Sequence, residues 1–258
     1  TVQSAIDAVP ENLKSPWLIF VKNGSYEEQV IIPQNKPFIH LIGQDKERTI
    51  IHLKLNVGGK PDANTKDLAY WHYSVHNPKS AVSHFEGAVV NINASDFYSE
   101  NISYVNDWGL EAQNGPQALA LKTKADRIAF YNCKFRSFQD TWMTTTRDAD
   151  RHYVKECWLE GAVDYFYGGG NALVEESTLY NVRSGSVIVA PCHESVKYGY
   201  VFRNCVIDGN EQAADGKLKL GRPWHNSPKA VYINTLVKIP LAPEGWTNMG
   251  TIPALFAE

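Results

Sequence analysis

The sequence lacks the features that mark several large classes of protein. Its net charge is -3, so it has no basic excess with which to meet the phosphates of a nucleic acid. No apolar run approaches the ~18 residues of a membrane span. No signal peptide precedes the opening TVQSAIDAVP, and a mature secreted protein would look the same. The composition, 43% hydrophobic and 21% charged residues over 258 positions, is typical of one soluble domain.

Cysteine is scarce. Cys133, Cys157, Cys192 and Cys205 show no CxxC spacing and no nearby histidine pair, so we expect no zinc site and no other cofactor. Cys133, Cys157 and Cys205 lie in the strands of a repeat described below, which favours a buried, apolar role. A Cys133–Cys157 disulfide stays an alternative, because neighbouring layers of a stacked fold lie within the usual Cα range of about 4.4–6.8 Å.

Two familiar catalytic motifs are also missing. The eight histidines, His193 and His225 among them, accompany no serine in a GxSxG elbow, which disfavours a Ser-His-Asp hydrolase of that kind. The run Gly168-Gly169-Gly170 precedes an apolar strand and not a helix, so a phosphate-binding loop is not expected.

What the sequence does contain is a repeat of short strands. Six segments have a polar residue, then usually a small one, and an apolar residue after one more step: SENISYV, FYNCKFR, VKECWLE, VEESTLY, FRNCVID and YINTLVK. The polar residues are Asn101, Asn132, Glu156, Glu176, Asn204 and Asn234, at intervals of 31, 24, 20, 28 and 30. Short strands with a variable period favour an all-β parallel β-helix spanning residues 1–258 as one domain. The pattern alone leaves a β-sandwich or a propeller open.

Both ends and one internal stretch interrupt this repeat. SAIDAVP near the start predicts a short amphipathic helix that caps the core. Residues 56–80 lose periodicity, and we expect a long loop that walls a cleft. The chain stops on an apolar-rich segment, which suggests that its C-terminus is trimmed.

Polar residues recur at nearly one coil between Gln117 and Tyr167. Gln117 and Asp140 are 23 residues apart, and Asp140 and Asp164 are 24 apart. Residues one coil apart in stacked parallel strands lie about 4.8 Å from one another. The spacing therefore predicts a column of amides and carboxylates on one surface, and this column is the candidate active site.

Each member of the column also has a structural interpretation. Asp164 in an apolar setting would have a raised pKa unless Arg222 holds it, and the two would otherwise be a structural ion pair. Asp140 beside it would make a pair with one ionised and one protonated acid, or else is a solvated turn residue. Gln117 and Gln139 would donate to an oxyanion or form a polar ladder. Adjacent strand residues face opposite sides, so Gln139 and Asp140 share the site only if a turn or bulge intervenes.

Four blocks taken together, QALAL, FQDTW, GAVDYFYG and LGRPW, resemble the signature blocks of the pectin methylesterase (pectinesterase) family. TVQSAIDAVP and GSYEEQV resemble its N-terminal blocks, so the similarity covers nearly the whole chain. The resemblance implies a right-handed parallel β-helix that hydrolyses galacturonate methyl esters of pectin, and we expect a bacterial member.

The resemblance also implies a role for each residue of the column. Asp164 is then the nucleophile, Asp140 the general acid and base, and Arg222 the residue that orients the nucleophile. Gln117 and Gln139 form the oxyanion hole. Contacts with the sugar are expected from Trp224, Tyr167, Tyr165, Met143 and Trp246.

The chain departs from the family in the block VDYFYG, where VDFIFG is usual, and in lacking the usual segment after the last strand. We expect a monomer that is secreted or located in the periplasm or cell envelope, with pectin as its partner. Two alternatives stay open, an acyl thioesterase on the same scaffold and a carbohydrate-binding β-helix without catalysis. A polysaccharide lyase is disfavoured, since no lysine adjoins Asp140 or Asp164.

Overall fold

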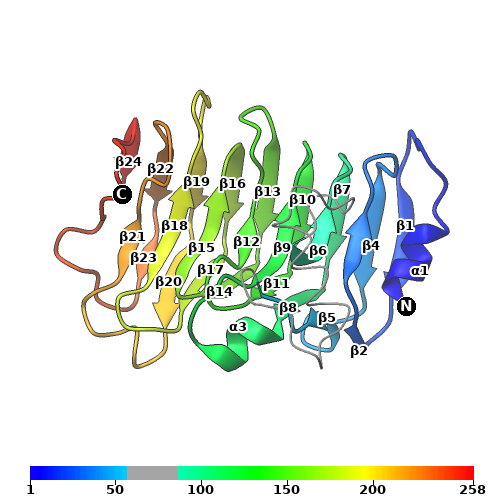
Figure 1. Cartoon of the computed structure of the whole chain (residues 1–258), viewed down its shortest axis with the longest axis horizontal. Helices are drawn as coiled ribbons and strands as arrows, with labels where there is room; N and C mark the ends of the chain where they lie inside the picture. The colour runs from blue at the N-terminus through cyan, green and yellow to red at the C-terminus, as the bar shows by residue number, and fades with distance from the viewer. Residues whose placement is uncertain (57–86) are drawn as a thin grey trace.

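The computed structural model of the protein describes residues 1–56 and 87–258. In this part of the chain the strands form three sheets, and every pairing between strands is parallel. Each sheet takes one strand from successive coils, so the sheets run side by side along the length of the molecule (Figure 1). This arrangement is a parallel β-helix, and the predicted fold class is confirmed.

The three sheets are named A, B and C. Sheet A contains β1 (Trp17–Val21), β4 (Ile39–Gly43), β7 (Phe97–Glu100), β10 (Ile128–Tyr131), β13 (Arg151–Lys155), β16 (Asn171–Glu175), β19 (Tyr200–Arg203), β22 (Lys229–Ile233) and β24 (Leu255–Ala257). Sheet B contains β2 (Gly24–Glu27), β5 (Thr49–Leu53), β8 (Ser103–Asn106), β11 (Lys134–Arg136), β14 (Trp158–Gly161), β17 (Thr178–Asn181), β20 (Val206–Gly209) and β23 (Leu236–Val237). Sheet C contains β3 (Val30–Ile32), β6 (Ala88–Ile92), β9 (Leu119–Thr123), β12 (Trp142–Met143), β15 (Val163–Gly168), β18 (Val187–Pro191) and β21 (Lys219–Gly221).

The polar residues of the repeat turn the chain from sheet A to sheet B. All six have a positive φ, between 48° and 58°. This left-handed conformation is costly for most L-residues and least so for glycine, asparagine and aspartate. Asn132 also donates from Nδ2 to Oδ1 of Asn101 on the preceding coil, at 2.7 Å. The repeat is therefore a column of sharp turns, and after five of the six turns the next residue is buried.

The core is continuous from end to end. It combines aliphatic side chains with a column of aromatic rings, such as Tyr104 stacked on Phe135 and Phe202 stacked on Tyr232. Cys133, Cys157 and Cys205 are buried in it at the turns, as expected, and all four cysteines are free thiols.

The N-terminal end of the core is covered by α1 (Val2–Asp7), as predicted (Figure 1). Val2 and Ile6 are buried, and the carboxylate of Glu28 accepts hydrogen bonds from the backbone N–H groups of Val2 and Gln3. We predicted a loop over residues 56–80, and residues 57–80 lie outside the described part of the chain. Within residues 1–56 and 87–258, no helix has the length and apolar character needed to cross a membrane.

Candidate active site

Asp164 leaves the regular strand pattern at a β-bulge in β15. Val163 pairs with Val187 and Phe166 with Val189, so three steps along β15 oppose two along β18. Asp164 itself has a φ of 50°. A bulge changes the direction of the side chains around it, so an acidic residue in a buried strand can point away from the apolar core.

Arg222 holds the Asp164 carboxylate with a two-pronged contact. Its Nε lies 2.9 Å from Oδ1, and its Nη2 lies 2.6 Å from Oδ2. Burial raises the pKa of Asp164, and the hydrogen bonds and charge of Arg222 oppose that rise. Arg222 follows β21, two strands from β15 in sheet C, so the guanidinium reaches across the outer face of the sheet. The planar fork fixes the carboxylate in one orientation and favours its ionised form.

Asp140 lies one coil from Asp164. The bridge between Gln139 and Val163 and the pairing of Trp142 with Phe166 place Asp140 opposite Asp164 in register. Burial, and then the charge of Asp164, raise the pKa of Asp140 well above its usual range, against smaller opposing effects of Arg222 and of a hydrogen bond with Tyr167. The pair therefore favours a protonated Asp140 beside an ionised Asp164. The predicted adjacency of the two carboxyl groups is what the structure has.

The condition for Gln139 and Asp140 to share one face is also met. Asp140 has a φ of 61°, so the alternation of the strand is broken between the two residues. The Oε1 atom of Gln139 lies 3.3 Å from the position that a Cβ at Gly115 would occupy, which brings this side chain close to the segment of Gln117. Leu119, two residues after Gln117, belongs to a separate apolar cluster with Tyr167. The two carboxyl groups and Gln139 therefore lie together, and the place of Gln117 in the same surface stays a prediction.

An apolar patch adjoins the carboxylates. Tyr167, Met143 and Trp224 pack together with the small or aliphatic residues Ala88, Leu119 and Ala190. The rings of Tyr167 and Trp224 lie 5.6 Å apart and are tilted by 65°. Three of the side chains that we expected to meet a sugar are therefore beside the candidate site.

One expected sugar contact, Tyr165, is wrong, and a second, Trp246, lies apart from this patch and stays a prediction. Tyr165 is fully buried in the core, where its hydroxyl donates to Oδ1 of Asn181 at 3.2 Å. The bulge that turns Asp164 toward Arg222 turns its neighbour into the core. Trp246 packs on the core through Phe256 and Tyr232, at ring distances of 4.4 and 5.9 Å. It closes the C-terminal end of the core and does not line the patch.

A basic groove on the other side of Arg222 was not predicted. It has a volume of about 530 Å³, and its lining includes Arg183, Lys217 and Lys219 with Arg222. Lys217 and Lys219 have acidic partners in Asp215 and Glu244, whereas the guanidinium of Arg183 lies over the ring of Phe138. The two lysines and the arginine of the run KLKLGR could have indicated a basic surface here. Arg183 lies about a coil away in the sequence, and nothing around it indicated that it joins this groove.

Metal binding has no support in the described ranges, 1–56 and 87–258. No group of three or more histidine, cysteine, aspartate or glutamate side chains there is placed to hold an ion. The chemistry of the site is built from carboxylates, amides and a guanidinium.

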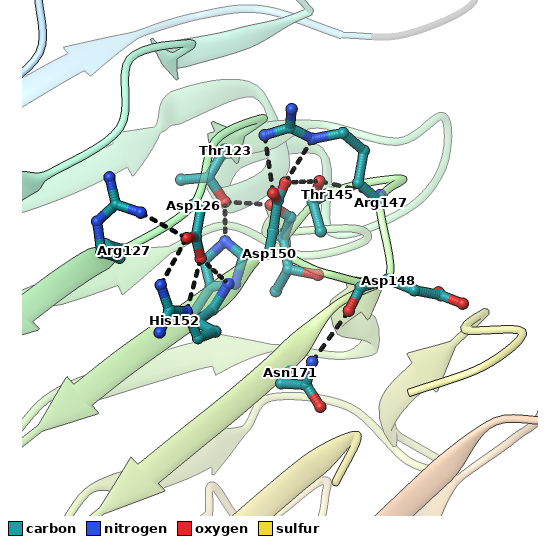
Figure 2. Close-up of polar contacts among 11 residues, drawn as sticks. Thr123, Asp126, Arg127, Thr145, Arg147, Asp148, Asp150, His152 and Asn171 are labelled. Carbon is teal, nitrogen blue, oxygen red and sulfur yellow. Dashed lines mark hydrogen bonds and ion pairs between the residues drawn. The ribbon is translucent and has the colours of Figure 1, made fainter. Parts of the chain in front are cut away.

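A polar network joins the chain segments that follow β12 to those that begin β13 and β16 (Figure 2). Nε2 of His152 lies 3.0 Å from Oγ1 of Thr123, which also accepts a hydrogen bond from the indole of Trp142. Because Trp142 is two residues after Asp140, this network fixes the strand that positions the acid. The other labelled members are Asp126, Arg127, Thr145, Arg147, Asp148, Asp150 and Asn171.

His152 makes the stability of the protein depend on pH. Burial lowers its pKa to about 4, from 6.5 in an exposed histidine. The unfolded chain then binds a proton between these values that the folded chain does not, so stability falls as pH drops from about 6.5 to about 4. We expect this residue to account for about 3 kcal/mol of that loss. The free energy of unfolding of the wild type and of His152→Gln is measured with urea at pH 7, 5.5 and 4.5. If this free energy falls equally with pH in both proteins, the assignment to His152 is contradicted.

Known proteins resemble the chain over nearly its whole length. The pectinesterase family matches residues 1–71 and 72–255. Pectinesterase 31 of Arabidopsis thaliana is 32% identical over 97% of this chain and 73% of its own length. The chain covers 59% and 62% of two other curated relatives.

Solved structures of pectin methylesterases also resemble the chain. Pectin methylesterase from Aspergillus niger superposes with a TM-score of 0.78 and 27% identity, over 100% of this chain and 79% of that one. The carrot enzyme shares the fold with a TM-score of 0.81 and 23% identity, over 100% of this chain and 76% of that one. These proteins come from plants and a fungus, so the bacterial origin stays a prediction. The predicted family and its class, carboxylic ester hydrolase, are confirmed: the chain belongs to the pectinesterase family.

Proposed function

We propose that this chain hydrolyses the methyl esters of galacturonate in pectin by way of an acyl-enzyme formed on Asp164. The observation that carries the proposal is the pair of carboxyl groups on successive coils, one held ionised by Arg222 and the other favoured in its protonated form. A nucleophile and a proton donor need these opposite states at the same pH.

The reaction uses each group in turn. Asp164 attacks the ester carbonyl carbon, and the amides of Gln117 and Gln139 donate to the oxyanion. Asp140 gives its proton to the departing methoxide, and methanol leaves. Asp140, now ionised, takes a proton from water, which attacks the acyl group and restores Asp164 as the galacturonate carboxylate departs.

The surroundings of the carboxylates suit a polymer of acidic sugars. Tyr167 and Trp224 offer aromatic faces to the sugar rings on one side of Arg222. The groove with Arg183, Lys217 and Lys219 on the other side offers cations to free carboxylates. A monomeric, single-domain enzyme that acts outside the cell or in the cell envelope belongs to the same proposal, because pectin is a cell-wall polymer.

Methanol release from methylated pectin by the wild-type protein tests this function. Turnover with pectin supports it. Turnover of acyl thioesters without methanol release from pectin would replace it with the thioesterase alternative, and no turnover of either substrate would favour a binding protein.

The oxyanion donors make a separate prediction. Gln139→Ala should lower kcat by roughly 10²–10³, because one hydrogen bond to the developing charge is lost. KM should change little, since the bond strengthens only as the charge forms. Gln212→Ala, at an exposed glutamine outside the site, is the matched control. A kcat within threefold of wild type for Gln139→Ala would remove this residue from the oxyanion hole.

A further inference from the structure

A second chain of hydrogen-bonded side chains lies on the outer face of sheet B. Oγ of Ser25 is 2.7 Å from Nε2 of His52, and Nδ1 of the same imidazole is 2.6 Å from Oδ2 of Asp107. Ser25 is exposed, and the side chains of His52 and Asp107 retain 21% and 30% of their exposure. This hydroxyl, imidazole and carboxylate have the connectivity of a nucleophile, a base and the group that orients the base.

The register of the β-helix brings the three residues together. Ser25 in β2 pairs with Ile50 in β5, and His52 lies two residues further along that strand. His52 in turn pairs with Val105 in β8, and Asp107 follows two residues later, at the start of α3 (Asp107–Ala112). A step of two residues keeps a side chain on the same face. The three residues therefore form one diagonal across three coils, on a different sheet from Asp164.

The hydrogen bonds fix the tautomer of the imidazole. An ionised carboxylate is an acceptor only, so Nδ1 of His52 carries the hydrogen that Asp107 receives. In the neutral ring Nε2 is then the unprotonated nitrogen, and it accepts the hydroxyl hydrogen of Ser25. This is the protonation state in which a serine can be deprotonated as it attacks.

The backbone supplies a donor beside the serine. β2 is the end strand of sheet B, so one of its edges has no neighbouring strand among residues 1–56 and 87–258. The N–H groups of Gly24 and Glu28 bond to carbonyls of residues 48 and 52 beside β5, and by alternation the N–H of Ser25 points to the open edge. The nucleophile's own N–H is a common member of an oxyanion hole.

We propose that Ser25, His52 and Asp107 form a second esterase site, which accepts small acyl esters such as acetyl esters. Ser25 attacks the carbonyl carbon while its proton passes to Nε2 of His52. The tetrahedral intermediate collapses, and the protonated imidazole gives that proton to the leaving alcohol. Water then attacks the acyl-serine, its proton passes to His52 and on to Oγ of Ser25, and the carboxylic acid is released.

The test uses the Asp164→Asn protein, in which the proposed methylesterase is removed and the second site is intact. Hydrolysis of p-nitrophenyl acetate should persist there, and adding Ser25→Ala should lower it at least about tenfold. A fluorophosphonate should label Ser25, and His52→Gln should suppress the labelling. Asp107→Asn acts through His52, so it should lower kcat and leave KM unchanged.

Ser184 provides the matched control, because it is an exposed serine that hydrogen-bonds a carboxylate, Asp215, without an imidazole. Ser184→Ala should leave both the rate and the labelling of Ser25 as they were. Equal rates with and without Ser25, or labelling that ignores His52, would overturn the second site. These measurements do not depend on methanol release by Asp164, so a negative result at Ser25 leaves the proposed methylesterase untouched, and the reverse also holds.

Discussion

Asp164→Asn should abolish methanol release from methylated pectin, with kcat lower by on the order of 10⁴ or more, the size of effect seen when the nucleophile or its base is removed from an acyl-transfer enzyme. The amide cannot form the acyl-enzyme, an anhydride, because it has no carboxylate oxygen with which to attack. Asparagine has the size of aspartate. Its Oδ1 can still accept a hydrogen bond from Nε of Arg222, which in the wild type lies 2.9 Å from Oδ1 of Asp164. The measurement is methanol release under saturating substrate.

The fold should survive this substitution. Loss of the charge leaves Arg222 without its counter-ion, but this arginine side chain keeps 26% of its exposure to solvent. The far-ultraviolet circular dichroism spectrum should therefore match that of the wild type. Binding of demethylated pectin should also persist, since the aromatic patch and the basic groove are unchanged. A folded variant with a near-normal rate would show that another group attacks the ester.

The sequence predicted that Asp140 and Asp164 adjoin because their spacing is set by the coils of the β-helix. The interval of 24 residues between Asp140 and Asp164 is one coil, and the strands place the two acids in register. The strands β9 and β12 instead pair residues that are 21 apart, so Gln117 lies two residues out of register with Asp140. The polar residues of the repeat were also recognisable. Their left-handed conformation was not, because glutamate at two of the six turns has no special preference for it.

Other features depend on contacts that spacing does not encode. A one-residue bulge decides that Asp164 faces outward and Tyr165 inward, and GAVDYFYG gives no sign of it. Trp246 is placed by its contact with Phe256 in the last strand. Ser25, His52 and Asp107 are separated by 27 and 55 residues, so no common interval relates them. Such a diagonal becomes visible only when the register of the strands is known.

Asp140→Asn should lower kcat by about 10²–10⁴, the usual contribution of a general acid and base. The wild type needs Asp164 ionised and Asp140 protonated, so its rate should fall at low pH as Asp164 gains a proton and at high pH as Asp140 loses one. Burial and the charge of Asp164 place this alkaline limb well above the usual range of an aspartate. The limbs report the pair as a whole, because the two acids interact.

The shape of the pH profile separates a proton donor from a merely structural acid. Asparagine at position 140 cannot lose a proton in this range, so the residual activity of Asp140→Asn should have no alkaline limb of this origin. Its acid limb should remain, because Asp164 still has to ionise. Substrates with better leaving groups than methanol should recover part of the lost rate of acylation, since their departure needs less help from an acid. A variant that loses activity yet keeps the full bell-shaped profile would mean that Asp140 supports the site without transferring the proton.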